Sequence, residues 1–131
     1  MDRYLKLERL TLHPCSQCRY IGGTVKKLDI VNSPQVLMIH ISRFNCGLQK
    51  IDAFVKFPTE LTTKHIRSGD GHLSFRLMGI IAHKGSTIAA GHYIAYILIE
   101  GIWYEADDRR MTRVTRQRVS SLEAYILFYQ S

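Results

Sequence analysis

Short apolar runs, broken every few residues by turn-forming residues, dominate this sequence and restrict it to a strand-rich fold. Gly, Pro, Asn, Asp and Ser separate runs that are rich in β-branched and aromatic residues, a pattern typical of strands joined by turns. Five runs are strong strand candidates: Val36 to Phe44, Phe75 to Ala82, His92 to Ile99, Ile102 to Glu105 and Ala124 to Tyr129. We predict that these five runs form the central sheet.

The remaining secondary-structure signals are weaker. Val25 to Val31 is a further strand candidate, and it ends before Pro34, which removes a backbone donor and enforces a turn. The best helix signal is Arg116 to Glu123, where Thr115 is placed to cap a short helical turn. Two polar segments with glycines are predicted as loops: Thr62 to Gly71 and Lys84 to Ala90.

The length and composition indicate a single soluble domain in a reducing compartment. A chain of 131 residues with 46% hydrophobic residues suits one globular domain, and its longest apolar runs, such as Ile94 to Ile99, are too short to span a bilayer. The first ten residues, MDRYLKLERL, do not resemble a secretory signal. Three cysteines fit free thiols or metal ligands better than disulfides. We therefore expect a cytoplasmic and/or nuclear protein.

The net charge of +7 does not by itself predict a nucleic-acid or membrane partner. The one basic cluster, RRMTRVTRQR from Arg109 to Arg118, has Thr and Val interleaved with its charges. We interpret it as the solvated face of a strand or loop. No nucleic-acid partner and no membrane association are expected.

A histidine and an aspartate are brought together by the predicted hairpin in GHYIAYILIEGIWYEADD. Glu100-Gly101 separates two apolar runs, and a two-residue turn there would place Ile99 opposite Ile102. Counting back along both arms puts Asp107 diagonally across from His92 on the same face. An imidazole held by a carboxylate on one nitrogen keeps the other nitrogen free to act as a base or to pair with a thiolate. By the same alternation, Asp108 should point to the other face.

This geometry alone leaves a structural hydrogen bond as the more common explanation of a His and an Asp on one hairpin face. Gly91, directly before His92, and the polar loop before it favour a site instead, because glycine lets another backbone approach closely. A peptide-like substrate needs that room.

Several separated blocks of the chain resemble the ubiquitin-specific proteases, in the order VLMIHISRF, VKFP, GIIAHKG, GHYIAY, WYEADD and AYILFY. The resemblance covers most of the chain. It implies a papain-like cysteine protease fold, α+β and strand-dominated, with a mostly antiparallel palm sheet, part of the fingers and no thumb. The implied division is a fingers remnant at about 1–35 and a palm at about 36–131. The implied partners are ubiquitin or ubiquitinated proteins.

The resemblance also implies roles for individual residues. His92 matches the general base of the family, Asp107 the acid that orients it, and Asp108 an auxiliary acid. A thiolate attacks the carbonyl of the last ubiquitin glycine in this family, and the histidine protonates the departing amine. The loop from His83 to Gly91 resembles a substrate-blocking loop, although a histidine placed like His83, just before a turn, is more often structural than a ligand. The residues assigned to substrate binding are Gly91, Tyr93, His83 and Gly85.

No residue of the chain matches the cysteine box that supplies the family's nucleophile. Cys46 lies in Asn45-Cys46-Gly47, which is predicted to be a hairpin tip without a following helix. We therefore expect a fragment that supplies the base and the orienting acid, is inactive alone, and would need an N-terminal half. The alternatives are a non-catalytic ubiquitin-binding or scaffold module and an inactive fragment.

Cys15-Ser16-Gln17-Cys18 has the spacing of half a zinc ribbon. A closed structural zinc site takes four ligands, so two more would be needed, for example His13 and another group. We expect no cofactor, and zinc only if two further ligands are supplied.

Overall fold

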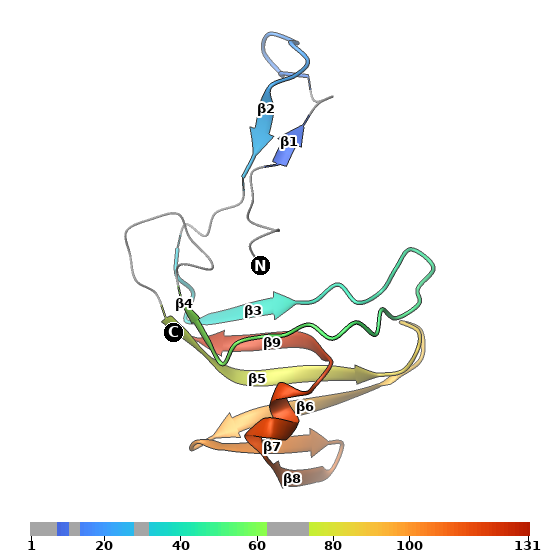
Figure 1. The fold of residues 1–131 in the computed structure, drawn as a ribbon, viewed down its shortest axis with the longest axis vertical. Coiled ribbons are helices and arrows are strands. Elements are labelled where there is room, and N and C mark those ends of the chain that lie inside the picture. Colours follow the sequence, from blue (N-terminus) through green and yellow to red (C-terminus); the bar gives the residue numbers. More distant parts are fainter. Residues whose placement is uncertain (1–7, 11–13, 28–31, 63–73) are drawn as a thin grey trace. The chain divides into compact units, whose positions relative to one another are not determined.

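The computed structural model describes residues 8–10, 14–27, 32–62 and 74–131, which belong to two compact units (Figure 1). Unit 1 comprises Met1–Ser33 and Thr62–Leu73, and unit 2 comprises Pro34–Leu61 and Ser74–Ser131. Among the described residues, no helix is both long and apolar enough to cross a membrane. The predicted loop Thr62 to Gly71 lies almost wholly outside the described residues.

The described part of unit 1 is a small antiparallel hairpin. Strand β1 (Glu8–Leu10) pairs with β2 (Thr24–Lys26). The strand predicted at Val25 to Val31 therefore overlaps β2 at its first two residues, and residues 28–31 lie outside the described part of the chain. Between β1 and β2 the chain turns back on itself, with the amide of Cys15 donating to the carbonyl of Tyr20 at 3.0 Å.

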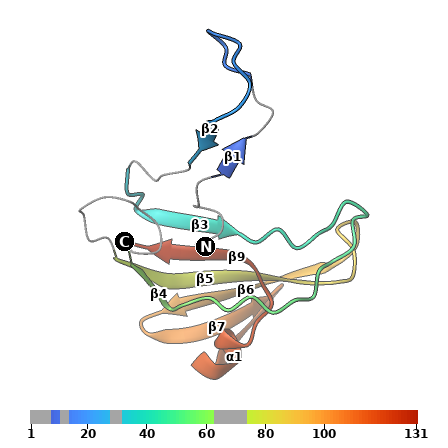
Figure 2. The same cartoon turned by 45° about the horizontal axis from the view of Figure 1, so that its top comes forward.

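Unit 2 is built on a seven-stranded antiparallel sheet, in which the strands follow the order β3-β9-β5-β6-β7-β8 and β4 pairs with β5 (Figures 1 and 2). One short helix, α1 (Arg116–Ser120), precedes the last strand. The strands are β3 (Val36–His40), β4 (Glu60–Thr62), β5 (Ser74–Lys84), β6 (His92–Ile99), β7 (Ile102–Asp107), β8 (Arg110–Val114) and β9 (Ala124–Gln130).

All five predicted sheet segments contain a strand, and the helix cap is confirmed. The hydroxyl of Thr115 accepts a hydrogen bond from the amide of Arg118 at 3.2 Å, although α1 ends at Ser120 instead of continuing to Glu123. The basic cluster, interpreted as a strand or loop face, forms the exposed strand β8 and part of α1. Strands β1 and β4 were not predicted, because each has three residues and too little sequence to show alternation.

Strand β3 ends at His40, short of the predicted Phe44, because the chain beyond it is organised around Arg43. This arginine is 2% exposed, and its guanidinium donates to the carbonyls of Ala124 at 2.5 Å, Ile51 at 3.2 Å and Ala53 at 2.8 Å. These carbonyls belong to segments outside strand pairing or at a strand end. The Arg43 side chain thus gives these carbonyls charge-assisted hydrogen bonds in place of the backbone hydrogen bonds that a neighbouring strand would supply.

Arg43→Ala should lower the free energy of unfolding by about 3 kcal/mol, because three buried or half-buried carbonyls lose a charged donor. Arg43→Lys should lose less, since an ammonium keeps the charge but cannot reproduce the planar fork. Chemical denaturation measures both changes. Arg113→Ala, at an exposed site on β8, is the matched control and should change stability by no more than about 0.5 kcal/mol. An Arg43→Ala protein as stable as the control would contradict this account.

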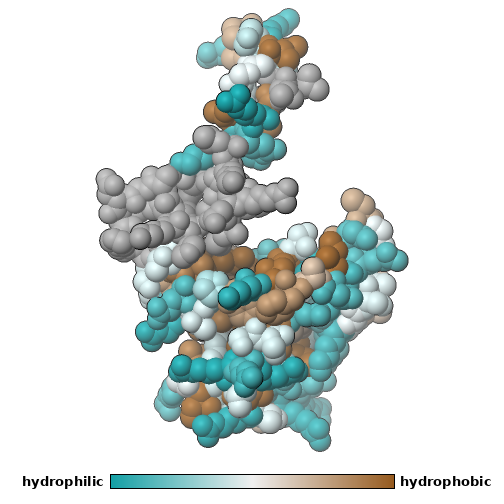
Figure 3. Space-filling model, viewed as in Figure 1, coloured by the Kyte–Doolittle hydropathy of each residue, from teal (hydrophilic) through white to brown (hydrophobic). Residues whose placement is uncertain are grey.

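The core of unit 2 lies on one face of the sheet. Its largest buried apolar side chains come from β5, β6, β7 and β9, and α1 and the turn after it contribute Val119 and Leu122. The main members on the sheet are Leu77, Ile80, Ile94, Tyr96, Trp103, Leu127 and Tyr129. Figure 3 shows hydrophilic and hydrophobic patches side by side on the surface of unit 2. Several large apolar side chains are exposed, among them Met38 and Phe54.

Strands β6 and β7 are joined by the predicted two-residue turn. Ile99 pairs with Ile102, and the turn residues Glu100 and Gly101 both have positive φ, at 47° and 79°. Two successive left-handed residues match the twist of a hairpin, and this is the reason that asparagine followed by glycine is common there. Glutamate is a poor residue for the first position.

Glu100→Asn should therefore raise the free energy of unfolding by about 1 kcal/mol or less, because asparagine adopts the left-handed conformation at lower energy. Glu100→Gln keeps the shape of glutamate and is the control, with no expected gain. Thermal unfolding of the two variants beside the parent chain measures the difference. A gain for glutamine equal to that for asparagine would instead assign the effect to removal of the negative charge.

Candidate active site

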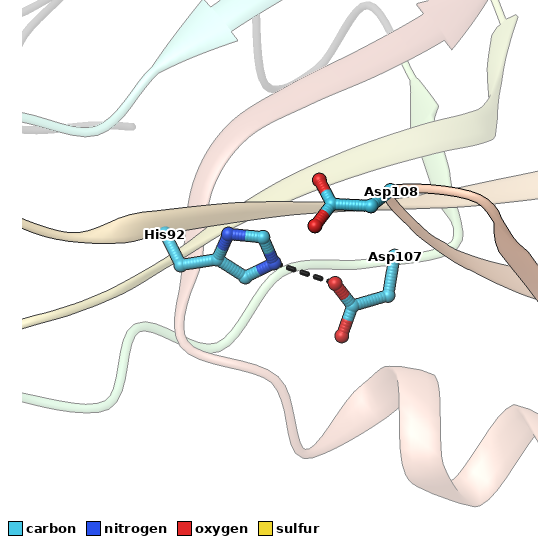
Figure 4. Close-up of side chains that lie close together, drawn as sticks. All are labelled: His92, Asp107 and Asp108. Atoms are coloured by element: carbon cyan, nitrogen blue, oxygen red, sulfur yellow. Dashed lines mark hydrogen bonds and ion pairs between the residues drawn. The ribbon is translucent and has the colours of Figure 1, made fainter.

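His92 and Asp107 form a direct hydrogen-bonded pair at one end of the β6–β7 hairpin (Figure 4). Nε2 of His92 lies 2.5 Å from Oδ1 of Asp107. His92 begins β6 and Asp107 ends β7, and Ala95 pairs with Ala106, so the alternation of both strands puts the two side chains on one face. The predicted register and the predicted pairing are both confirmed. Both side chains are partly exposed, at 43% and 36%.

Asp108 lies beside this pair, and the expectation that it points to the other face is wrong. Strand β7 ends at Asp107, and Asp108 occupies a turn with a φ of 51°, so strand alternation no longer fixes its direction. Ligand-type atoms of His92, Asp107 and Asp108 all lie within 4.8 Å of one another. Figure 4 shows the carboxyl group of Asp108 on the same side as the imidazole. The site therefore has two acids beside one histidine.

The two acids favour the charged form of the imidazole. The hydrogen bond that the ring of His92 donates to Asp107 is the largest cause that raises the pKa of His92 above its ordinary value of 6.5, and the charges of Asp107 and Asp108 add to it. Partial burial and the nearby Lys84 act in the opposite direction. A histidine held in this way is a stronger base, and its orientation is fixed by Asp107.

Nδ1, the second ring nitrogen of His92, makes no hydrogen bond to any described residue. Cys46, the cysteine of unit 2, does not bond to His92. Cys46 is exposed at the tip predicted for it, where the amide of Asn45 donates to Gln49 and that of Leu48 donates to Asn45. His92 therefore has one nitrogen oriented by an acid and one nitrogen available to another group.

The four residues predicted to bind substrate lie together around the ring of His83. A Cβ atom built on Gly91 would meet Nε2 of His83 at 2.0 Å, and one built on Gly85 would meet Cε1 of His83 at 3.0 Å. The ring of Tyr93, which is 50% exposed, lies 4.8 Å from that of His83. His83 itself is 3% exposed, so direct contact with a substrate does not fit its place in this structure. Its neighbours make it a support for the loop, and substrate binding by Gly85, Gly91 and Tyr93 stays a prediction.

The predicted loop before His92 is attached to the Cys46 hairpin by backbone hydrogen bonds, a contact that the sequence did not indicate. The amide of Lys50 donates to the carbonyl of Ser86 at 2.8 Å, and that of Ile88 donates to Leu48 at 3.2 Å. This attachment restrains the segment that leads to Gly91 and His92.

Two further residues, Tyr96 and Glu105, stabilise the β6–β7 hairpin, and neither was predicted from the sequence. The hydroxyl of the buried Tyr96 donates to Oε2 of Glu105 at 2.7 Å. Burial, followed by the neighbouring Glu105, raises the pKa of Tyr96 to about 12, so the phenol stays protonated and remains a donor. Glu105 and Asp107 are two residues apart and therefore share a face of β7. This alternation is the sequence signal that could have predicted a polar contact for Glu105.

In unit 1, the side chains of Cys15 and Cys18 lie within hydrogen-bonding distance of each other. Backbone amides of Cys18 and Gln17, followed by the thiol of Cys18, lower the pKa of Cys15, which favours a thiolate that could bind a metal. No third His, Cys, Asp or Glu joins them among the described residues, and His13 lies outside that part. Two thiols do not complete a four-ligand zinc site, so the described residues do not fit a structural zinc on their own.

Unit 2 is strand-dominated and carries a histidine oriented by an acid at the end of a hairpin. These are the base and the orienting acid of a hydrolase that works through a nucleophile. The particular family follows from sequence: the chain belongs to the ubiquitin carboxyl-terminal hydrolase family, whose sequence model matches residues 3–129. Its fold is the papain-like fold of the structurally similar ubiquitin-specific proteases.

The relatives are considerably longer than this chain. Ubiquitin carboxyl-terminal hydrolase 23 of Arabidopsis thaliana is 33% identical over 98% of this chain and 16% of its own length. Ubiquitin carboxyl-terminal hydrolase 8 of Saccharomyces cerevisiae is 32% identical over 98% of this chain and 31% of its own. The chain thus spans less than a third of each of these two relatives.

Solved structures of SAGA DUB modules are similar to the chain in fold. A module of Ubp8, Sgf11, Sus1 and Sgf73 bound to monoubiquitin has a chain with a TM-score of 0.86 and 34% identity, and the match covers 98% of this chain and 31% of that one. The same module bound to ubiquitin aldehyde gives a TM-score of 0.84 and 30% identity, with 98% and 32% covered.

Proposed function

We propose that this chain contributes the general base and the orienting acid to thiol-dependent hydrolysis of the bond after the C-terminal glycine of ubiquitin. The observation that carries the proposal is the 2.5 Å contact of His92 Nε2 with Asp107 Oδ1 in a chain of the ubiquitin carboxyl-terminal hydrolase family. Asp108 is an auxiliary acid whose charge adds to the field at the imidazole. Ubiquitin or a ubiquitinated protein is the proposed partner, and no cofactor is needed.

In this mechanism His92 works through its free nitrogen, Nδ1. It accepts the proton of a cysteine thiol supplied by a separate segment, and the resulting thiolate attacks the carbonyl carbon of the ubiquitin glycine. His92 then gives the proton to the departing amine, which leaves an acyl-thioester. It next takes a proton from water, whose oxygen attacks the thioester, and it returns that proton to the departing thiolate, so that ubiquitin and the free thiol are released. Asp107 holds the tautomer and stabilises the imidazolium that forms twice in the cycle.

The proposal is tested with ubiquitin that carries a fluorogenic amide at its C-terminus. We expect no turnover by the 131-residue chain alone, since Cys46, the cysteine of unit 2, makes no contact with His92. A chimera in which this chain replaces the matching third of Saccharomyces ubiquitin carboxyl-terminal hydrolase 8 should release the fluorophore. His92→Ala should abolish that release, whereas His40→Ala, at an exposed histidine on β3, should leave it intact. A folded and active chimera that tolerates His92→Ala would refute the role of His92.

The same chain offers a second candidate function, non-catalytic binding of ubiquitin, because its partly exposed histidine has no described nucleophile. A titration of ubiquitin against the chain and against the chimera separates the two functions. Binding by the chain, combined with a folded chimera that never releases the fluorophore, would favour the scaffold and reject the hydrolase.

A further inference from the structure

Unit 2 contains a concave pocket at the turn end of the β6–β7 hairpin, the end opposite to His92 and Asp107. It has a volume of about 430 Å³, within the range of about 300–1,000 Å³ of ligand pockets. Five elements, β4, β5, β6, β7 and α1, and the segment before β4 surround it, so no single run of sequence shows it. Its apolar lining includes Phe57, Leu98, Trp103 and Val119. Neither the family assignment nor the pairing of His92 uses this pocket.

The rim of the pocket is positively charged. Arg76 of β5 and Arg116 of α1 line it, and an adjoining hollow of about 470 Å³ adds Arg113 of β8. The two hollows share Gly101, Trp103 and Arg116. Glu60 is the one acid among the residues that line them. Within the described part of the chain, none of the three arginines forms an ion pair with a carboxylate.

We propose that this pocket docks a short acidic peptide segment of a partner protein, which inserts one large apolar side chain and places carboxylates on Arg76, Arg113 and Arg116. An apolar floor with guanidinium groups around it matches such a segment, because carboxylates accept paired hydrogen bonds from arginine while an apolar anchor leaves water. Strand β8 is the terminal strand in the sheet order, so an extended segment also finds a free strand edge beside the rim. This proposal does not depend on the proposed hydrolase function.

Two other occupants fit the pocket less well. Single-stranded nucleic acid binds by stacking bases on exposed aromatic rings, but Trp103 is 5% exposed. A second copy of this chain would bring a formal net charge of +7 toward a basic rim. An acidic peptide has neither problem.

The test uses the 131-residue chain and a fluorescein-labelled peptide with one phenylalanine flanked by two glutamates on each side, followed by fluorescence anisotropy. Saturable binding is expected, and Arg116→Gln and Arg76→Gln should each weaken it about tenfold. Arg116→Lys keeps the positive charge and should keep most of the binding. A loss seen with Arg116→Gln but not with Arg116→Lys is then due to the lost charge and not to misfolding. The matched control is Arg110→Gln on the same strand as Arg113. Arg110 lines a different hollow, where Asp107 and Asp108 balance the charge of Arg109 and Arg110, and its replacement should have little effect.

Four outcomes would overturn the proposal. The first is that the peptide shows no saturable binding, and the second is that Arg110→Gln weakens peptide binding as much as Arg116→Gln does. The third is that a peptide with alanine in place of phenylalanine binds with equal affinity. The fourth is that an oligonucleotide of the same length displaces the peptide and depends on Arg116 to the same extent. A dimer of the chain that Arg116→Gln dissociates would also overturn it, since the occupant would then be a second copy.

Discussion

Asp107→Asn should lower the pKa of His92 and leave the imidazole neutral over a wider range of pH. The hydrogen bond that His92 donates to Asp107 is the largest cause of the raised pKa, and the charge of Asp107 is a further one. Once both are removed, partial burial and Lys84 act against the remaining charge of Asp108. The amide can also hold the wrong tautomer of the ring, and in a hydrolase chimera this should reduce kcat by orders of magnitude, about 10⁴-fold in a comparable triad.

The pKa is measured by following the ring proton signals of His92 by NMR as the pH is changed. Asp108→Asn is the matched control, because it removes a neighbouring charge without removing the hydrogen bond, and it should lower the pKa less. An equal shift in the two variants would mean that the local field, and not the hydrogen bond, sets the basicity of His92.

The same pKa shift makes a statement about stability. The folded pKa of His92 is raised, so its contribution to stability is fully present below the unfolded pKa of histidine and is lost as the pH rises through the folded pKa. In the Asp107→Asn variant this pH dependence should diminish. Denaturation midpoints of the parent and the variant at weakly acidic and at alkaline pH should therefore differ more on the acidic side.

Gly91→Ala should lower the free energy of unfolding by about 1–3 kcal/mol, as expected for an added group in a packed site. The new Cβ would lie 2.0 Å from Nε2 of His83 and 2.8 Å from the carbonyl oxygen of Lys84. The ring of His83 cannot move away from the new Cβ, because it is 3% exposed and packs edge-on against Phe44. The backbone that leads into His92 must then move, which should also weaken the bond to Asp107.

Gly79→Ala, on β5, is the control for this change. A Cβ there would meet its nearest neighbour at 3.6 Å, an ordinary contact, and should be tolerated. A double variant, His83→Ala with Gly91→Ala, should recover part of the loss, because the smaller side chain gives the Cβ room. Additive losses in the double variant would show that His83 is not what excludes a side chain at position 91.

The pairing of His92 with Asp107 could be predicted from the sequence because it depends on local rules. A two-residue turn at Glu100-Gly101 and the period of two along a strand are enough to set the register. The same rule failed one residue later, at Asp108, because a turn with positive φ ended the alternation. Periodicity therefore predicts a side chain's direction only while the strand lasts.

The packing around the site could not be predicted in the same way. Arg43 and Ala124, His83 and Gly91, and Lys50 and Ser86 meet through loops and strand ends, where no period constrains direction. The rim of the proposed docking pocket likewise draws Arg76, Arg113 and Arg116 from β5, β8 and α1.

By itself, the sequence determined the strand-rich class, the β6–β7 hairpin and the two groups that it brings together, because turn preference and alternation act over a few residues. Tertiary structure decided which polar groups are buried, where β3 stops, why Gly91 must be glycine and where the arginines gather. Those outcomes depend on contacts between segments far apart in the chain, and a one-dimensional pattern does not record such contacts.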